Sequence, residues 1–375
     1  MAGAAVAVAA AADAGADDEH DAPHRDRPAQ RIIRERVDND YSHGLVAGLL
    51  FPDGGVRIVA YGDSGLGRPL DPDDVFEIGS ITKVFTGTLL AEMAQRGEVA
   101  LDEPVKTLVP AGVTVPARNG RTITLEDLAT HTSGLPRLPE NLAPAGESDP
   151  YVDYTPQQLY DFLSSYTLTR DVGAEFEYSN EGAGLLGHLL ALRAGQSYAD
   201  IVRERILAPL GMTSTAVEVT APMRERFVQG HDGDGRAVAH WNFTTLAGAG
   251  GLRSTAADML AFAAAGLDDI GMHALDSRME LAKVHTPVVL PAAVLERYAG
   301  EYAGPDGSVT LAGADGGLTA DSPGLPPLRL LAIDNTTFFI KPDNALVTFE
   351  LEAGGRVTGA VLEGGGAQIR FTKTR

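Results

Sequence analysis

The sequence predicts an α+β fold in which a mixed helix-and-sheet domain, residues 32–282, is followed by a small antiparallel β-barrel domain, residues 290–375. Two observations support this division. In the first part, runs with helical spacing of apolar residues alternate with β-prone runs. From Leu290 onward the runs are short, alternate apolar and polar residues and are separated by turns, which is typical of an all-β domain. With 375 residues, 44% of them hydrophobic, the chain can bury a core in both parts.

The elements of the first domain follow from its apolar spacing. Residues 44–51 and 55–61 are apolar, β-prone runs on either side of Pro52-Asp53-Gly54, a pattern typical of a β-hairpin. From Ser80 onward apolar residues recur every four positions, which predicts a helix that ends near Gly97. That helix is apolar around much of its circumference, so we expect it to be buried. Further helical runs cover residues 182–196 and 255–265.

Residues 1–31 are expected to be disordered or signal-like. Residues 3–12 resemble the apolar core of a signal peptide and Ala12-Asp13-Ala14 resembles a cleavage site, but no Lys or Arg precedes them. Residues 13–31 are rich in Asp, His, Arg and Pro, which predicts disorder. A signal this weak leaves an extracytoplasmic location (periplasmic or secreted) and a cytoplasmic one both open. No apolar run is long enough to span a bilayer.

Composition excludes several classes of function. A formal net charge of −21 repels phosphate backbones and anionic lipid, so we expect no nucleic-acid partner and no membrane partner. The chain has no cysteine, which excludes disulfides, a thiol nucleophile and Cys-ligated metals. Its nine histidines form no H-E-x-x-H pattern, so we expect no metal site and no cofactor.

A possible nucleophile lies at the start of the first predicted helix, in Ser80-Ile81-Thr82-Lys83. Residues three apart share one face of a helix, so Lys83 can reach the Ser80 hydroxyl. A serine hydroxyl needs a neighbouring base, and Lys83 can serve if burial lowers its pKa. The free amides at a helix N-terminus can stabilise the oxyanion formed on attack. The motif alone also fits a serine N-cap followed by a solvent-facing lysine.

Four segments favour the catalytic interpretation, because they resemble one family in sequence and in order. They are FEIGSITKVFTGTLLAEMAQRGEVALDEPV around Ser80, LATHTSGLP at residues 128–136, FEYSNEGAGLLGHLL at residues 176–190 and AGAGGLRSTAADMLAF at residues 247–262. This part of the chain resembles the β-lactamase-related serine hydrolases, which include class C β-lactamases, D-alanyl-D-alanine carboxypeptidases and family VIII carboxylesterases. The resemblance implies a β-lactamase/transpeptidase-like domain that hydrolyses ester, amide or peptide substrates through an acyl-enzyme, without a cofactor.

The resemblance also implies roles for individual residues. Tyr178, in Tyr178-Ser179-Asn180, is expected beside Ser80 and Lys83, where its phenol passes a proton between the serine and the leaving group. Asn180 is expected to hydrogen-bond Lys83 and the substrate's amide or ester oxygen. His131 is expected to shape a loop beneath the site rather than to form a Ser–His triad. The implied catalytic residues are therefore Ser80, Lys83 and Tyr178, with Asn180 in substrate binding.

The third motif of the family, a Lys- or His-x-Gly triplet on a central strand, has no convincing counterpart here. Residues 267–276 resemble the family's final helix and follow the 255–265 helix almost directly, so the intervening strands look deleted. His231-Asp232-Gly233 matches H-x-G but precedes the glycine-rich segment, and His285-Thr286-Pro287 lacks the glycine. We therefore expect a reduced central sheet, and association into a homo-oligomer through its exposed edge. The alternative function is an impaired family member that acts as a ligand-binding or assembly module.

The C-terminal region from Leu290 resembles the lipocalin-like barrel appended to many members of the family. Residues 298–302, Tyr-Ala-Gly-Glu-Tyr, are its usual opening. The barrel is expected to cover the site mouth, limit substrate size or mediate assembly. Whether the chain is an esterase, a peptidase or a β-lactamase stays open.

Overall fold

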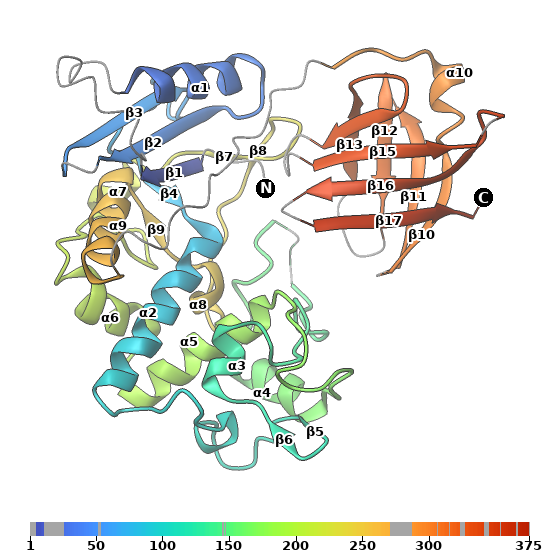
Figure 1. Cartoon of the computed structure of the whole chain (residues 1–375). Coiled ribbons are helices and arrows are strands. Elements are labelled where there is room, and N and C mark those ends of the chain that lie inside the picture. The colour runs from blue at the N-terminus through green and yellow to red at the C-terminus, as the bar shows by residue number, and fades with distance from the viewer. Residues whose placement is uncertain are drawn as a thin grey trace.

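The structure is a computed structural model that describes residues 5–10, 26–51, 54–144, 146, 148–270, 287–305, 307–314, 316–322, 327–340, 345–352, 354–364 and 367–374. Figure 1 shows a mixed helix-and-sheet domain in blue to yellow and a barrel in orange to red. The predicted α+β fold class with a C-terminal barrel is therefore confirmed. The domain boundary predicted between 282 and 290 lies largely outside the described residues, which stop at 270 and resume at 287.

The first domain contains a three-stranded sheet in the order β1-β2-β3. Strands β2 (Gly44–Leu50) and β3 (Val56–Gly62) form the predicted antiparallel hairpin. Alternate residues of β2 point to opposite faces of the sheet, as strand geometry requires. Leu45 and Ala47 pack with Ile33 of helix α1 (Arg27–Asp38), whereas Val46 packs on the other face with Ala256 of helix α9 (Ala256–Ile270). The sheet is thus covered on both faces, as Figure 1 shows.

The N-terminal segment differs from the expectation of a disordered or signal-like region. Strand β1 (Ala5–Ala10) pairs in parallel with β2, from Ala5 opposite Leu45 to Ala10 opposite Leu50. Helix α1 begins at Arg27, inside the segment for which disorder was expected, and buries Ile33. An apolar run satisfies the pattern of a signal core and that of a buried strand equally well, so sequence alone could not separate them. The cleavage-like Ala12-Asp13-Ala14 lies outside the described residues.

Among the described residues this sheet has three strands, β1, β2 and β3. The reduction of the central sheet remains a prediction. The helix expected at 255–265 extends to Ile270, so the first residues of the supposed final helix continue α9. Residues 271–276 lie outside the described part of the chain.

Three helices form the centre of the helical region. Helix α2 (Thr82–Gln95) buries Phe85, Leu89 and Met93, as its apolar spacing predicted. Helix α5 (Asn180–Ala194) packs on α8 (Ala247–Gly250) so closely that a Cβ on Gly187 would lie 2.9 Å from the Gly248 Cα. Only glycine permits this backbone approach. The other helices and 3₁₀ or π turns are η2 (Gly79–Ile81), η3 (Val105–Thr107), α3 (Leu125–Ala129), α4 (Pro156–Ser165), α6 (Tyr198–Val202), η4 (Arg203–Leu207) and α7 (Ala221–Arg224).

Short two-stranded sheets connect the loops of this region. They are β4 (Phe76–Glu77) with β9 (Arg253–Ser254), β5 (Ala117–Arg118) with β6 (Arg121–Thr122), and β7 (Gly230–His231) with β8 (Ala237–Val238). The pair β4–β9 matters most for the site, because β4 ends two residues before the η2 turn that contains Ser80.

The C-terminal domain is a closed antiparallel barrel that follows helix α10 (Ala292–Leu295). Aromatic residues fill its interior, among them Tyr298, Tyr302, Phe338 and Phe349. Pairing of its first and last strands closes it and leaves no open edge. Its strands are β10 (Gly300–Gly304), β11 (Gly307–Ala314), β12 (Gly317–Asp321), β13 (Leu328–Ala332), β14 (Thr337–Ile340), β15 (Ala345–Leu351), β16 (Val357–Gly364) and β17 (Ala367–Lys373).

Candidate active site

Ser80 lies exposed in the η2 turn, directly before helix α2. The turn is fixed on both sides. Gly79 adopts a left-handed φ of +50°, which glycine tolerates best. On the other side, the buried Thr82 hydroxyl accepts a hydrogen bond from the Leu252 amide at 3.1 Å. These contacts hold a solvent-accessible serine hydroxyl on a rigid base.

Lys83 reaches the serine from one turn along the helix. Its Nζ donates to Ser80 Oγ at 3.1 Å, to Asn180 Oδ1 at 2.8 Å and to the Ala249 carbonyl at 2.7 Å. Burial lowers the pKa of the Lys83 ammonium, and the nearby positive charge of Arg137 lowers it further, whereas Tyr178 opposes both effects. Lys83 is therefore closer to yielding a neutral amine, the form that can accept the serine proton, than a lysine in water.

Tyr178, which directly precedes the N-cap of helix α5, contacts the same Ser80 hydroxyl. Its Oη donates to Ser80 Oγ at 2.5 Å, and the Lys83 Nζ lies 4.7 Å from its ring centroid. The next residue, Ser179, is the N-cap of α5 and accepts from the Gly182 amide at 2.8 Å. The cap explains how Tyr-Ser-Asn, which resembles a turn in sequence, becomes the rigid start of a helix.

The structure thus brings together all four residues singled out in the sequence: Ser80, Lys83, Tyr178 and Asn180. Ser80 lies in the η2 turn directly before α2 and Lys83 in the first turn of α2. Tyr178 directly precedes the N-cap of α5 and Asn180 is its first residue, and α2 and α5 pack on one core. The arrangement supplies a nucleophilic hydroxyl with two possible proton acceptors within hydrogen-bond distance.

His131 supports this cluster from beneath. Its backbone has a left-handed φ of +59°, its Nδ1 accepts a hydrogen bond from the Ser179 amide at 3.1 Å, and its ring centroid lies 4.7 Å from that of Tyr178. Burial, and then the charge of Lys83, lower the pKa of its imidazole. A neutral ring whose Nδ1 accepts must hold its proton on Nε2. His131 therefore positions Tyr178, in line with the role expected from the sequence.

The H-x-G triplet at His231 does not join the cluster. His231 lies in β7, and its ring stacks on His43 with the centroids 3.8 Å apart. None of its described contacts is with Ser80 or Lys83. The triplet at His285 lies outside the described residues apart from Pro287.

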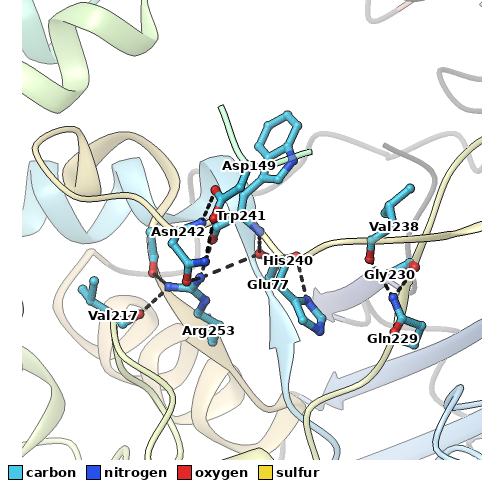
Figure 2. A network of polar contacts seen from close by, with 11 residues as sticks. Glu77, Asp149, Val217, Gln229, Gly230, Val238, His240, Trp241, Asn242 and Arg253 are labelled. Atoms are coloured by element: carbon cyan, nitrogen blue, oxygen red, sulfur yellow. Dashed lines mark hydrogen bonds and ion pairs between the residues drawn. The ribbon is translucent and has the colours of Figure 1, made fainter. Parts of the chain in front are cut away.

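A buried arginine, which the sequence analysis did not single out, anchors the segment that leads to the nucleophile. The Arg253 guanidinium donates to the carbonyls of Val217 and Trp241 (Figure 2). Its Nη2 lies 3.9 Å from Glu77 Oε1. Glu77 also accepts from the Trp241 amide at 2.8 Å. Burial lowers the pKa of Arg253, and the charge of Glu77 opposes that shift. The network ties the 237–246 loop to β4, three residues before Ser80.

This loop adds aromatic side chains near the site that sequence reasoning also missed. Tyr151 stacks on Phe243 with ring centroids 4.4 Å apart and meets Trp241 edge-on at 5.5 Å. Burial raises the pKa of the Tyr151 hydroxyl, while Arg137 and a hydrogen bond with Asn180 oppose the shift. The single tryptophan of the chain was visible in the sequence, but no local pattern placed it near Tyr151.

The described residues contain no cluster of three or more His, Cys, Asp or Glu side chains suited to a metal ion. In the same part of the chain, no helix combines the length and apolar character needed to cross a membrane.

The fold and this cluster define a class of serine-hydrolase architecture in which a lysine one helical turn away and a tyrosine share the nucleophile's hydroxyl. A family model described as Beta-lactamase matches residues 29–324, well over half of the chain, and the chain belongs to the β-lactamase family. The matched range ends inside the barrel, after β12.

Curated relatives match a little over half of this chain. The chain is 35% identical over 216 residues to the D-alanyl-D-alanine-carboxypeptidase/endopeptidase AmpH of Escherichia coli (strain K12), covering 56% of this chain and 54% of that protein. It is 29% identical over 235 residues to penicillin-binding protein 4 of Amycolatopsis lactamdurans, covering 59% and 58%. The chain thus spans about half the length of the curated relatives it matches.

Solved structures show the same fold. A β-lactamase/D-alanine carboxypeptidase from Yersinia pestis, complexed with citrate, matches with a TM-score of 0.55 and 23% identity over 94% of this chain and 93% of that one. A class C β-lactamase from Rhodobacter sphaeroides matches with a TM-score of 0.54 and 24% identity, covering 94% of each chain.

Proposed function

We propose that this protein is a serine hydrolase that cleaves an ester or amide bond through an acyl-enzyme on Ser80. The observation that supports it is the double hydrogen bond at the Ser80 Oγ, from Tyr178 Oη at 2.5 Å and from Lys83 Nζ at 3.1 Å. A structural serine at a helix N-terminus would cap the helix amides. Here the N-cap positions of η2 and α2 are Ile78 and Ile81 rather than Ser80, and the Ser80 hydroxyl faces two proton-transfer groups.

In the first half of the reaction, the Ser80 Oγ attacks the carbonyl carbon and its proton passes to Lys83 or Tyr178. The bond from the carbonyl carbon to the leaving oxygen or nitrogen then breaks, and the same pair delivers that proton to the leaving group. In the second half, water attacks the acyl carbon of the ester on Ser80 and loses a proton to the pair. The bond between that carbon and Ser80 Oγ then breaks, the pair returns the proton to Oγ, and the acid is released. Asn180, held by Lys83 at 2.8 Å, orients the substrate amide or ester oxygen.

The oxyanion is expected to be less well stabilised than in a complete family member. The amide of Ser80, in the η2 turn before α2, supplies one donor. The family's second donor comes from the strand with the Lys- or His-x-Gly triplet, for which the described residues offer no counterpart. Loss of one such donor costs roughly 10²–10³ in turnover, so we expect slow turnover.

The substrate class follows from the relatives only in outline. The names of the matched proteins include a carboxypeptidase/endopeptidase, a penicillin-binding protein and several β-lactamases. We place small esters first, because an alkoxide or phenoxide leaves more easily than an amine and asks less of an incomplete oxyanion site.

The alternative is a ligand-binding or assembly module that keeps the pocket without turnover. The observation in its favour is that the described sheet has three strands, none of which carries a Lys- or His-x-Gly triplet. In that case Ser80 would not be acylated.

The test is to assay the full chain and its Ser80→Ala variant with p-nitrophenyl butyrate and a chromogenic cephalosporin, and to measure intact mass after a fluorophosphonate. Ser308→Ala, on an exposed barrel strand, is the matched control. We expect turnover and one covalent adduct in the parent and in Ser308→Ala, and neither in Ser80→Ala. A cooperatively folded parent with no turnover and no adduct would instead refute the hydrolase and leave the module as the better account.

A further inference from the structure

A second cation, Arg137, lies beside the nucleophile. Its charge lowers the pKa of Lys83, but its guanidinium takes no part in the proton transfers described above. The Cζ of Arg137 is 5.3 Å from the ring centroid of Tyr178, the same ring that Lys83 approaches to 4.7 Å. The hydroxyl of that ring contacts Ser80 Oγ at 2.5 Å. Only the Tyr178 side chain therefore links Arg137 to the nucleophilic oxygen of Ser80.

The backbone of Arg137 is fixed by the same helix that presents Tyr178 and Asn180. Its carbonyl accepts hydrogen bonds from the Asn180 amide at 3.0 Å and the Glu181 amide at 3.3 Å, two of the free donors at the start of α5. The side chain itself is exposed to solvent. A rigid main chain with an exposed guanidinium is suited to receive a ligand.

Arg137 also differs from the arginines nearest to it in sequence, because they form ion pairs with carboxylates. Among the described residues no carboxylate forms an ion pair with it, although the chain has 51 acidic residues against 30 basic ones. The arginines that surround it in sequence are all paired. Those pairs are Arg118–Asp171, Arg121–Asp127 and Arg170–Glu177.

We propose that Arg137 binds a carboxylate of the substrate, so that the site prefers esters or amides with a carboxylate near the scissile carbonyl. The inference rests on the proposed function. The planar guanidinium offers two parallel N–H donors to a carboxylate, a stronger contact than a single neutral hydrogen bond. In a protein of net charge −21, an anionic substrate needs such a local cation to overcome the overall repulsion.

The first test compares matched esters. One pair carries the charge on the acyl side, mono-p-nitrophenyl succinate against p-nitrophenyl butyrate. The other carries it on the leaving group, 4-carboxyphenyl butyrate against phenyl butyrate. For each pair, kcat/KM of the charged ester is divided by that of the neutral ester, in the parent and in Arg137→Gln. We expect this ratio to be about 10- to 100-fold lower in Arg137→Gln than in the parent for at least one pair.

Two further variants sharpen the result. Arg137→Lys keeps the charge but not the planar fork, so its ratio should lie between those of the parent and Arg137→Gln. Arg224→Gln removes an exposed arginine from α7 and should leave the ratio unchanged. Any effect of Arg137 on the pKa of Lys83 changes both esters of a pair alike and cancels in the ratio.

The second test does not need turnover. Binding of monomethyl succinate to Ser80→Ala protein is measured by calorimetry, with and without Arg137→Gln. Tighter binding with Arg137 present supports the proposal even if no ester is hydrolysed. Ser80-dependent hydrolysis with ratios unchanged within about 2-fold in both pairs would overturn the role of Arg137 and leave the hydrolase intact. Equal binding to both calorimetry proteins would overturn it as well.

Discussion

The helical region and the sheet of the first domain differ in how fully their polar groups are paired. Around α2 and α5, the lysine amine has three acceptors, the tyrosine hydroxyl has one, and the helix start is capped by Ser179 and by the Arg137 carbonyl. The sheet, in contrast, has three described strands, one of which is supplied by residues 5–10. The comparison teaches that the nucleophile and its proton-transfer partners depend on helix packing, whereas the third motif, for which the described residues offer no counterpart, is expected on the sheet.

The largest effect is expected for Lys83→Met, which tests whether the helical cluster performs the chemistry. Methionine fills a similar volume but cannot take the serine proton, so turnover should fall by about 10³-fold, within the range of general acid–base contributions. The measurement is kcat/KM for p-nitrophenyl butyrate. Lys106→Met, on an exposed lysine of η3, should behave like the parent. Equal turnover in the Lys83 variant and the parent would assign proton transfer to Tyr178 alone.

A buried carboxyl in the same region predicts a pH-dependent stability. Glu181, in the first turn of α5, is fully buried, neither of its carboxyl oxygens has a described hydrogen-bond partner, and burial raises its pKa to about 8. Its folded pKa lies above the unfolded value of 4.5, so the folded state holds the proton longer. The contribution of the protonated Glu181 carboxyl to the free energy of unfolding is therefore complete below about pH 4.5. This contribution falls as the pH rises and is lost above about pH 8.

Glu181→Gln removes this titration. We expect the variant to be more stable than the parent by roughly 3–5 kcal/mol at pH 9 and about equal to it at pH 4, because one pKa unit corresponds to about 1.4 kcal/mol. Urea unfolding at several pH values measures this difference. Glu175→Gln, at an exposed position before Tyr178, is the control. A constant difference between parent and Glu181→Gln across the pH range would show that Glu181 is ionised in the folded state.

The smallest effect is expected at the sheet. Deleting residues 1–10 removes β1 and leaves the outer edge of β2 unpaired, which should lower the free energy of unfolding by about 1–2 kcal/mol, since hydrogen bonds in a terminal strand contribute little each. Turnover should change by less than about 3-fold. Light scattering should show a larger species, because an open edge recruits strands. Deleting residues 1–4 keeps β1 and is the control. A loss of turnover comparable to that of Lys83→Met would contradict the independence of the two regions.

Sequence reasoning succeeded where the signal was local. Four-residue apolar spacing predicted the buried face of α2, the turn at residues 52–54 predicted the β2–β3 hairpin, and the alternation after Leu290 predicted the barrel. The motifs around Ser80 and Tyr178 named four residues that the structure joins in one hydrogen-bonded chain, from Tyr178 through Ser80 and Lys83 to Asn180.

Sequence reasoning failed where the outcome depends on pairing between distant segments. The parallel register of β1 on β2 is set across a connection that includes α1, so nothing within residues 5–10 specifies it. Tyr151 and Trp241 meet through two loops 90 positions apart, and Arg137 is identified only by the ring that it faces. No periodicity records such contacts.

Closure of the C-terminal barrel has a consequence for which part of this chain can start aggregation. Each barrel strand has a neighbour on both sides, so folded barrels of different molecules offer one another no main-chain template. The described sheet of the first domain ends in two strands that each have a single neighbour. During refolding at high concentration, fibril-like stacking should therefore start at the sheet. The barrel would then remain native and decorate the outside of such aggregates.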